Sequence, residues 1–355
     1  MPTSETAVAE ETAPLVTGDT VLEVVDLKTY FQADQTIARV VDGVSFGVRA
    51  GKTLAVVGES GCGKTVTSLS ILRLIPNPPG EIVGGQILFG GRDLVTMNAE
   101  ELQQLRGGEI AMIFQEPATS LNPVFTIGDQ IGEAIRLHRD LPESEIRAAV
   151  VQVLGEVRMS EPERRYDQYP HELSGGMKQR AMIAMALSCR PKLLIADEPT
   201  TALDVTIQAR VLELLKQVQQ ETQMAIMLIT HDLGVVAEMA DDVIVMYAGK
   251  IVERSTVNDL FAKPLHPYTR GLFGSIVRVD RQQDRLQAIE GNVPASTNLP
   301  QGCRFKTRCP LAFDKCDEEP PLTEIEPGRF SACWLADELK QQPLDTNAPA
   351  ASHTR

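Results

Sequence analysis

The sequence lacks any apolar run long enough to cross a membrane. A spanning helix requires roughly 18–20 consecutive apolar residues, whereas the best candidates, at 181–187 and 224–229, are short and bounded by polar residues. The N-terminus also lacks the basic region and apolar core of a secretory signal peptide. We therefore expect the chain to stay in the cytoplasm.

Positive charge is scarce relative to negative charge. The chain has 34 Lys and Arg residues against 48 Asp and Glu residues, which gives a net charge of −14. An acidic surface argues against broad contact with the phosphates of DNA or RNA, so we expect no nucleic acid partner. Residues 1–20 are rich in Thr, Ala, Glu and Pro, which is typical of a disordered tail, and we expect a second tail at 341–355.

The CxxC pairs of zinc ribbons and the CxxCxxC run of ferredoxins are also absent. Two of the six cysteines, Cys62 and Cys189, are expected to be small packing residues. The other four lie near the C-terminus with the spacing C-x5-C-x6-C-x16-C: Cys303, Cys309, Cys316 and Cys333. In a cytosolic protein such a cluster favours metal binding over disulfides. From chemistry alone, four thiolates could close either a tetrahedral or a cubane site.

A glycine-rich loop at 58–65, GESGCGKT, matches the P-loop pattern GxxxxGK[ST] in full. An apolar strand is predicted at 53–57 and a helix at 65–74, which is the context that a P-loop requires. The loop N–H groups and the positive end of the helix would bind phosphate. Lys64 would reach the β- and γ-phosphates, and the Thr65 hydroxyl would bind Mg²⁺. The nucleotide-binding residues predicted in the loop are Gly58, Ser60, Gly61, Cys62, Gly63, Lys64 and Thr65.

Two further motifs follow the P-loop in order. The sequence LSGGM at 173–177 precedes a helical pattern, and a helix start at Ser174, Gly175 and Gly176 would offer unpaired N–H groups to a phosphate. An apolar strand at 193–196 then leads into Asp197 and Glu198. Because Asp197 emerges where the strand meets the loop, we predict that it holds Mg²⁺ directly or through water.

This combination of motifs resembles the ATP-binding-cassette (ABC) ATPases. The resemblance implies a head-to-tail dimer with two ATP molecules, each held between the P-loop of one subunit and the LSGG element of the other. It also implies that Glu198 polarises the attacking water, and such general-base help is typically worth ~10²–10⁴ in rate. Four other residues match the family by position: Gln115, which would sense Mg²⁺ and touch the membrane partner; Asp204, which would lie across the dimer; His231, which would contact the γ-phosphate; and Phe31, which would stack on adenine, with Tyr30 as the alternative.

Longer stretches resemble a narrower family, the first (D-type) ATPase subunit of bacterial dipeptide and oligopeptide importers. The likeness runs from about residue 21 to 334 and includes 169–180, 196–206, HPYTR at 266–270, GNVP at 291–294 and the four C-terminal cysteines. Met177 replaces the Gln that usually follows LSGG, which favours a heterodimer with a second ATPase subunit. Some family members carry a [4Fe–4S] cluster, so the resemblance favours that cluster over zinc or metal-free thiols at the four cysteines.

The resemblance implies an α/β fold of the P-loop NTPase class. We expect an ABC nucleotide-binding domain at 21–265, made of a RecA-like core, an antiparallel β subdomain and an inserted helical subdomain at about 117–180. A small Cys-rich module would follow at 266–340.

The implied function is that of an ATP-hydrolysing motor for the uptake of dipeptides or oligopeptides. Its partners would be two transmembrane permease subunits, a second ATPase subunit and an extracytoplasmic peptide-binding protein, with the chain bound peripherally at the cytoplasmic face of the membrane. Importers of nickel or glutathione use related ATPases and remain alternatives. A soluble ABC ATPase of translation or DNA repair is less favoured, because the sequence has one cassette, no heptad arm and an acidic balance.

Overall fold

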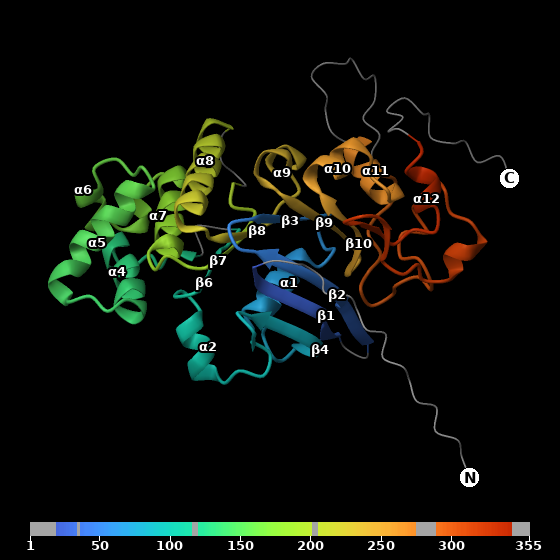
Figure 1. The fold of residues 1–355 in the computed structure, drawn as a ribbon. Coiled ribbons are helices and arrows are strands. Elements are labelled where there is room, and N and C mark those ends of the chain that lie inside the picture. The colour runs from blue at the N-terminus through green and yellow to red at the C-terminus, as the bar shows by residue number, and fades with distance from the viewer. Residues whose placement is uncertain (1–18, 34–35, 116–119, 201–204, 275–288, 343–355) are drawn as a thin grey trace, which may run out of the picture.

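The computed structural model describes residues 19–33, 36–115, 120–200, 205–274 and 289–342. Within these ranges the chain forms two sheets with helices packed around them (Figure 1). The predicted tails lie almost entirely outside the described residues, and so does Asp204.

The larger sheet has eight strands in the order β11-β12-β10-β9-β3-β8-β7-β6. Its parallel part consists of β6 (Ile110–Ile113), β7 (Leu193–Asp197), β8 (Ala225–Ile229), β3 (Thr53–Val57) and β9 (Asp242–Tyr247). The strands β3, β7 and β8 are buried along their whole length, as continuous apolar runs predict. The structure therefore confirms the strands expected at 53–57 and 193–196.

The antiparallel side of this sheet brings the C-terminal part of the chain onto the core. Strand β10 (Lys250–Thr256) forms a hairpin with β9, and β12 (Arg329–Ser331) pairs with β10. Strand β11 (Thr323–Glu326) then pairs with β12. The segment beyond residue 265 thus extends the sheet that carries the P-loop.

The smaller sheet is antiparallel, with strand order β2-β1-β4-β5. Its strands are β1 (Thr20–Ala33), β2 (Thr36–Arg49), β4 (Gly80–Phe89) and β5 (Arg92–Asp93). The alternating pattern of β1 stops at Asp26, yet the strand continues, because the register shifts there and Asp26 adopts a φ of 48°. The Asp26 N–H donates to the Ser45 Oγ at 2.8 Å. A β-bulge therefore hides the second half of the strand from a simple period-two reading.

Helices cover both sheets, and one group of them lies at the end of the molecule away from the C-terminal strands (Figure 1). That group consists of α4 (Ile127–His138), α5 (Glu143–Glu156), α6 (Pro162–Tyr166), the 3₁₀ helix η1 (Pro170–Glu172), α7 (Gly175–Leu187) and α8 (Val205–Thr222). The other helices are α1 (Lys64–Ile71), α2 (Ala99–Leu105), α9 (Leu233–Met239), α10 (Val257–Ala262), α11 (Pro267–Gly274), η2 (Asp314–Asp317) and α12 (Ala336–Leu339). Among the described residues, no helix combines the length and apolar character needed to span a bilayer.

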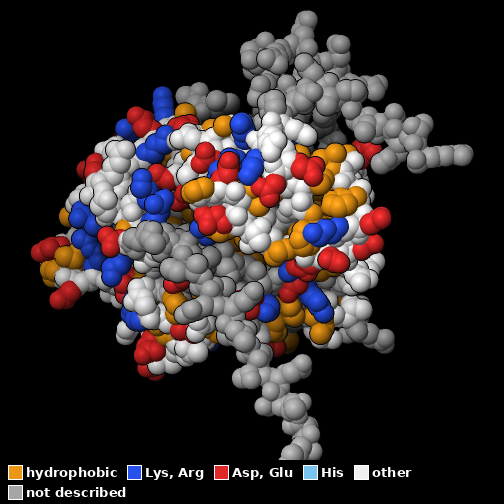
Figure 2. Space-filling model, turned by 45° about the vertical axis from the view of Figure 1, so that its right-hand side comes forward, with side chains coloured by type: hydrophobic (Ala, Val, Ile, Leu, Met, Phe, Trp, Pro, Cys, Tyr) orange, Lys and Arg blue, Asp and Glu red, His pale blue; other side chains and the backbone are white. Residues whose placement is uncertain are grey.

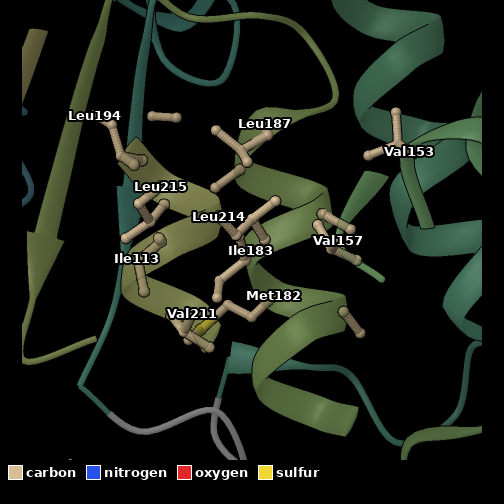
Figure 3. Close-up of a cluster of buried hydrophobic side chains, with 14 of the residues drawn as sticks. Ile113, Val153, Val157, Met182, Ile183, Leu187, Leu194, Val211, Leu214 and Leu215 are labelled. Atoms are coloured by element: carbon tan, nitrogen blue, oxygen red, sulfur yellow. The ribbon is translucent and has the colours of Figure 1, made fainter. Parts of the chain in front are cut away.

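Three buried clusters hold the layers together. The first joins the helical group to the sheet through side chains of α5, α7, α8, β6 and β7, which Figure 3 shows meeting between the helices. The second lies between the two sheets around α1. At the surface, Lys and Arg side chains are interspersed with Asp and Glu side chains over the face shown in Figure 2, so the acidic excess is mixed with basic groups there.

The third cluster packs the C-terminal segment against β3 and β9. Phe305 is 2% exposed, and its ring centroid lies 5.2 Å from that of Tyr247 and 5.4 Å from that of Tyr268. The ring centroids of Tyr247 and Tyr268 are 4.7 Å apart, and both residues are fully buried. Aromatic contacts of this kind add to the stabilisation that burial gives. The C-terminal segment is therefore part of the core packing.

Replacing Phe305 with Ala should destabilise the fold by about 3–5 kcal/mol, because the change leaves a cavity in a packed aromatic cluster. Urea unfolding followed by circular dichroism measures the loss. Phe313→Ala is the matched control, since Phe313 lies in the same segment and is 43% exposed. Equal midpoints for Phe305→Ala and wild type would contradict the packing described here.

Candidate functional site

The P-loop connects the buried strand β3 to the start of α1. Gly63 caps α1 with a φ of 106°, and a Cβ there would lie 2.6 Å from the Val40 carbonyl oxygen. A Cβ on Gly58 would lie 2.3 Å from the Met246 carbonyl oxygen. Any larger residue at these two positions would collide with the backbone of β2 or β9. The glycines therefore set how closely the loop can follow its neighbours.

Lys64 is buried and its ammonium is satisfied inside the loop. Its Nζ donates to the carbonyl oxygens of Gly58 at 2.7 Å and Glu59 at 2.9 Å. A cavity of about 270 Å³ adjoins the loop and is lined by residues that include Gly58, Glu59, His231 and Leu233. Phosphate oxygens could replace the two carbonyls as partners of the ammonium, because each offers the same acceptor chemistry with more negative charge.

Asp197 ends β7 and presents its carboxylate beside Thr65. The Thr65 hydroxyl hydrogen-bonds to this carboxylate, and Oδ1 is buried with no hydrogen-bond partner within the described part of the chain. Burial raises the pKa of Asp197, while the Thr65 hydroxyl and the charge of Lys64 act in the opposite direction. A buried carboxylate oxygen that lacks a partner, next to a hydroxyl, is a donor set suited to Mg²⁺.

Glu198 contacts two other predicted site residues, Gln115 and His231. Gln115 Nε2 donates to Glu198 Oε2 at 2.9 Å, and His231 Nδ1 lies 3.0 Å from Oε1. The three residues follow β6, β7 and β8, which are neighbours in the sheet, so their side chains emerge at one edge. Glu198 has a φ of 48°, an uncommon conformation for a residue with a side chain. Its N–H donates to the Ile229 carbonyl at 2.9 Å, which fixes this turn.

The LSGG element begins α7, whose N-cap is Ser174. Its Oγ accepts from the Met177 N–H at 3.4 Å. A Cβ added to Gly175 would meet nothing within 4 Å, so no described part of the chain requires glycine there for steric reasons. A glycine there would instead allow a group from outside the chain to approach the backbone closely. Figure 1 places α7 in the helical group, apart from α1.

A hydrogen bond that the sequence motifs did not indicate joins the LSGG helix to the loop after the strand that carries Asp197. Gln179 is 2% exposed, and its side chain amide donates to the carbonyl oxygen of Pro199, the residue after Glu198. Gln179 stands between Lys178 and Arg180 in the sequence, so no local pattern singled it out. This bond ties the start of α7 to the loop that follows Glu198.

The two aromatic candidates for adenine stacking face opposite sides of β1. The Tyr30 hydroxyl donates to Asp42 Oδ1 at 2.6 Å, and burial together with Asp42 raises the pKa of Tyr30 to about 12. Phe31 lies against Gly80, because a Cβ on that glycine would be 2.6 Å from the Phe31 ring. Tyr30 is therefore committed to a polar partner, which leaves Phe31 as the candidate with an apolar setting.

The four C-terminal cysteines line one small cavity of about 20 Å³. Its walls also include His266, Phe305, Leu311 and Trp334. Burial raises the pKa of the Cys309 thiol to about 11 and that of the Cys333 thiol to about 12. Within the described residues, no three His, Cys, Asp or Glu side chains converge closely enough to hold a single metal ion.

Two protein families match successive parts of the chain. The family described as ABC transporter matches residues 41–201, and that described as oligopeptide/dipeptide transporter, C-terminal region, matches residues 252–316. The oligopeptide transport ATP-binding protein AppD of Bacillus subtilis is 54% identical over 320 residues, which cover 90% of this chain and 98% of AppD. A probable peptide ABC transporter ATP-binding protein of Sinorhizobium fredii is 52% identical over 323 residues, with 90% and 96% covered.

A solved structure supports the fold. An ATP-binding cassette determined as a dimer bound to ADP and Pi matches with a TM-score of 0.60 and 24% identity, over 66% of this chain and 98% of that one. Fold and motifs together define an ABC-type ATPase. The chain belongs to the ABC transporter ATP-binding proteins that carry the oligopeptide/dipeptide transporter C-terminal region, which confirms the family expected from the sequence.

Glu198→Gln should lower ATP turnover by ~10²–10⁴, because the amide cannot accept a proton from water. Binding of MgATP should change little, since the amide keeps the shape of the carboxyl group. Steady-state phosphate release and a nucleotide-binding titration separate the two effects. Glu238→Gln removes the same charge at an exposed ion pair with Lys216 and serves as the control. Turnover near the wild-type rate in Glu198→Gln would remove Glu198 from the reaction.

Proposed function

We propose that the chain is the ATP-hydrolysing motor subunit of an ABC importer that takes up dipeptides or oligopeptides across the cytoplasmic membrane. The observation that carries the proposal is the continuous likeness to oligopeptide and peptide transport ATP-binding proteins over 90% of the chain. The matched C-terminal region supports a peptide substrate over nickel or glutathione, because its family description names oligopeptide and dipeptide transporters.

In the proposed mechanism Glu198 accepts a proton from the water that attacks the γ-phosphate. Gln115 and His231 contact its two carboxylate oxygens, which fixes the orientation of the carboxylate. Lys64 and the N–H groups of the loop would bind the phosphates. Mg²⁺ bound by Thr65, Asp197 and Gln115 would supply positive charge against the developing negative charge. Phe31 would stack on the adenine.

The proposal includes a dimer in which Ser174, Gly175 and Gly176 contact the ATP of a facing subunit. The open space at Gly175 supports this role, because glycine there serves no packing purpose within the described chain. Asp204 would lie across the same interface. We infer a second ATPase subunit as the partner, two permease subunits in the membrane, and a peptide-binding protein on the far side. The chain would sit peripherally at the cytoplasmic face.

Co-expression with the permease subunits tests this function. We expect the ATPase rate of the assembled complex in lipid to rise when peptide-loaded binding protein is added, because transport and hydrolysis are coupled. The Glu198→Gln complex is the matched control for phosphate released by contaminants. Stimulation by ribosomes or nucleic acid in place of the permease complex would instead support a non-transport ABC ATPase and would refute the motor role.

We also propose that Cys303, Cys309, Cys316 and Cys333 hold a [4Fe–4S] cluster in a C-terminal module at 266–340, attached to a nucleotide-binding domain at 21–265 whose helical subdomain spans about 117–180. The shared cavity supports a four-thiolate ligand set, which is the ligand set of a [4Fe–4S] cluster. A cavity of about 20 Å³ holds little more than a water molecule, so the thiols must move apart to admit the cluster. The cluster would then cross-link the 303–316 loop to Cys333.

Protein purified without oxygen should be brown and contain about four iron atoms and four sulfides per chain. Cys309→Ser should lose most of the iron, because it removes a ligand. Cys189→Ser, a partly buried cysteine outside the cavity, should keep the iron. Iron, sulfide and zinc analysis together with the visible spectrum measure the outcome. One zinc per chain, or no metal at all, would refute the cluster and leave the ATPase assignment intact.

A further inference from the structure

An arginine with a buried side chain, in the cysteine-bearing segment at 303–333, contacts the P-loop. Arg308 directly precedes Cys309, and its side chain is 4% exposed. Its Nη1 and Nη2 donate to the two carboxylate oxygens of Glu59 at 2.6 and 3.0 Å. Glu59 is the second residue of the P-loop, so this bidentate ion pair connects the C-terminal segment to the phosphate-binding loop. Paired charge-assisted bonds of this geometry are strong and directional.

The N–H groups of Arg308 that do not contact Glu59 donate to other groups of the chain. Its Nε donates to the carbonyl oxygen of Glu290 at 2.9 Å, and Nη2 also donates to that of Ile289 at 3.2 Å. Nη1 further donates to the Tyr247 hydroxyl at 3.3 Å. Because these bonds fix the side chain, the guanidinium is already oriented toward Glu59. Little side-chain entropy is then lost when the two residues pair.

Glu59 is held at three points, and two of them come from the C-terminal segment. Its N–H donates to the Tyr268 hydroxyl at 2.8 Å, and its carboxylate accepts from Arg308. Its carbonyl oxygen accepts from Lys64. The segment beyond residue 265 therefore sets both the path of the loop at Glu59 and the direction of its carboxylate.

The position of this carboxylate matters because Glu59 lines the cavity beside the P-loop. A carboxylate and a triphosphate repel each other, and the repulsion is stronger in a partly buried site than in water. Arg308 neutralises the carboxylate and holds it at the wall of the cavity. We propose that Arg308 is a positioning residue for nucleotide binding, through which the cysteine-bearing segment sets the affinity of the P-loop for ATP. This inference rests on the proposed ATP-binding role of the loop.

The test compares variants of the full-length chain by titration with MgATP and a fluorescent nucleotide competitor. Arg308→Gln should bind MgATP roughly tenfold more weakly, within the range of couplings between linked sites, because it leaves the Glu59 charge unpaired. Glu59→Gln should bind at least as tightly as wild type, and the double variant should regain most of the lost affinity. Turnover at saturating MgATP should stay close to wild type in Arg308→Gln, which gives a change in KM without a change in kcat.

Two controls make the result specific. Lys306→Gln removes a positive charge two residues away, at an ion pair with Asp317, and should leave the affinity unchanged. Trp334, the single tryptophan of the chain, lies in the same segment, and its emission reports whether that segment is folded.

Three outcomes would overturn the inference while wild type binds MgATP: equal affinities of Arg308→Gln and wild type, equal weakening in Arg308→Gln and Glu59→Gln, or no recovery in the double variant. If Arg308→Gln does not fold, the sign of the change in Glu59→Gln decides alone: weaker binding than wild type overturns the inference, and equal or tighter binding supports it. Failure of wild type itself to bind MgATP would instead refute the proposed function.

Discussion

The parallel pairing of β6, β7, β8 and β3 is the constraint on which the rest of the structure depends. These strands end at one edge of the sheet, and their carboxyl ends carry Gln115, Glu198, His231 and the P-loop. A parallel sheet requires both faces to be covered, which explains why helices and the smaller sheet pack around it. The site is therefore precise because it stands on buried strands, and the polar side chains need only short loops to reach one another.

The C-terminal segment joins the same sheet at the end of the strand order opposite β6. It adds β12 and β11 beyond β10, and it places Phe305 against Tyr247 and Tyr268. The hydroxyl groups of the same tyrosines are hydrogen-bonded: that of Tyr268 accepts from the Glu59 N–H of the P-loop, and that of Tyr247 accepts from Arg308, which pairs with Glu59. Apolar packing thus fixes the position of a polar network, since a buried tyrosine usually needs a partner for its hydroxyl.

The sequence predicted the parallel strands and the residues that gather at their ends, because continuous apolar runs and the P-loop pattern depend on local chemistry. It did not predict the length of β1, since the bulge at Asp26 breaks the alternation. It also missed Gln179, Tyr268 and Arg308. Each of these acts through a partner 20 to 249 residues away, and no local pattern encodes such a pairing. The variable positions of a P-loop motif, such as Glu59, give no sign of what they bind.

Two arginines with buried side chains lie between Cys303 and Cys309, and each forms an ion pair with the nucleotide-binding part of the chain. Arg304 follows Cys303 and pairs with Asp42, while Arg308 precedes Cys309 and pairs with Glu59. A buried ion pair adds little net stability, because desolvation offsets most of the attraction, yet an unpaired buried charge is costly. Each arginine therefore disfavours any docking geometry in which its carboxylate is absent. Since Asp42 lies on β2 and Glu59 in the P-loop, the two pairs select one placement of the cysteine-bearing segment against the nucleotide site.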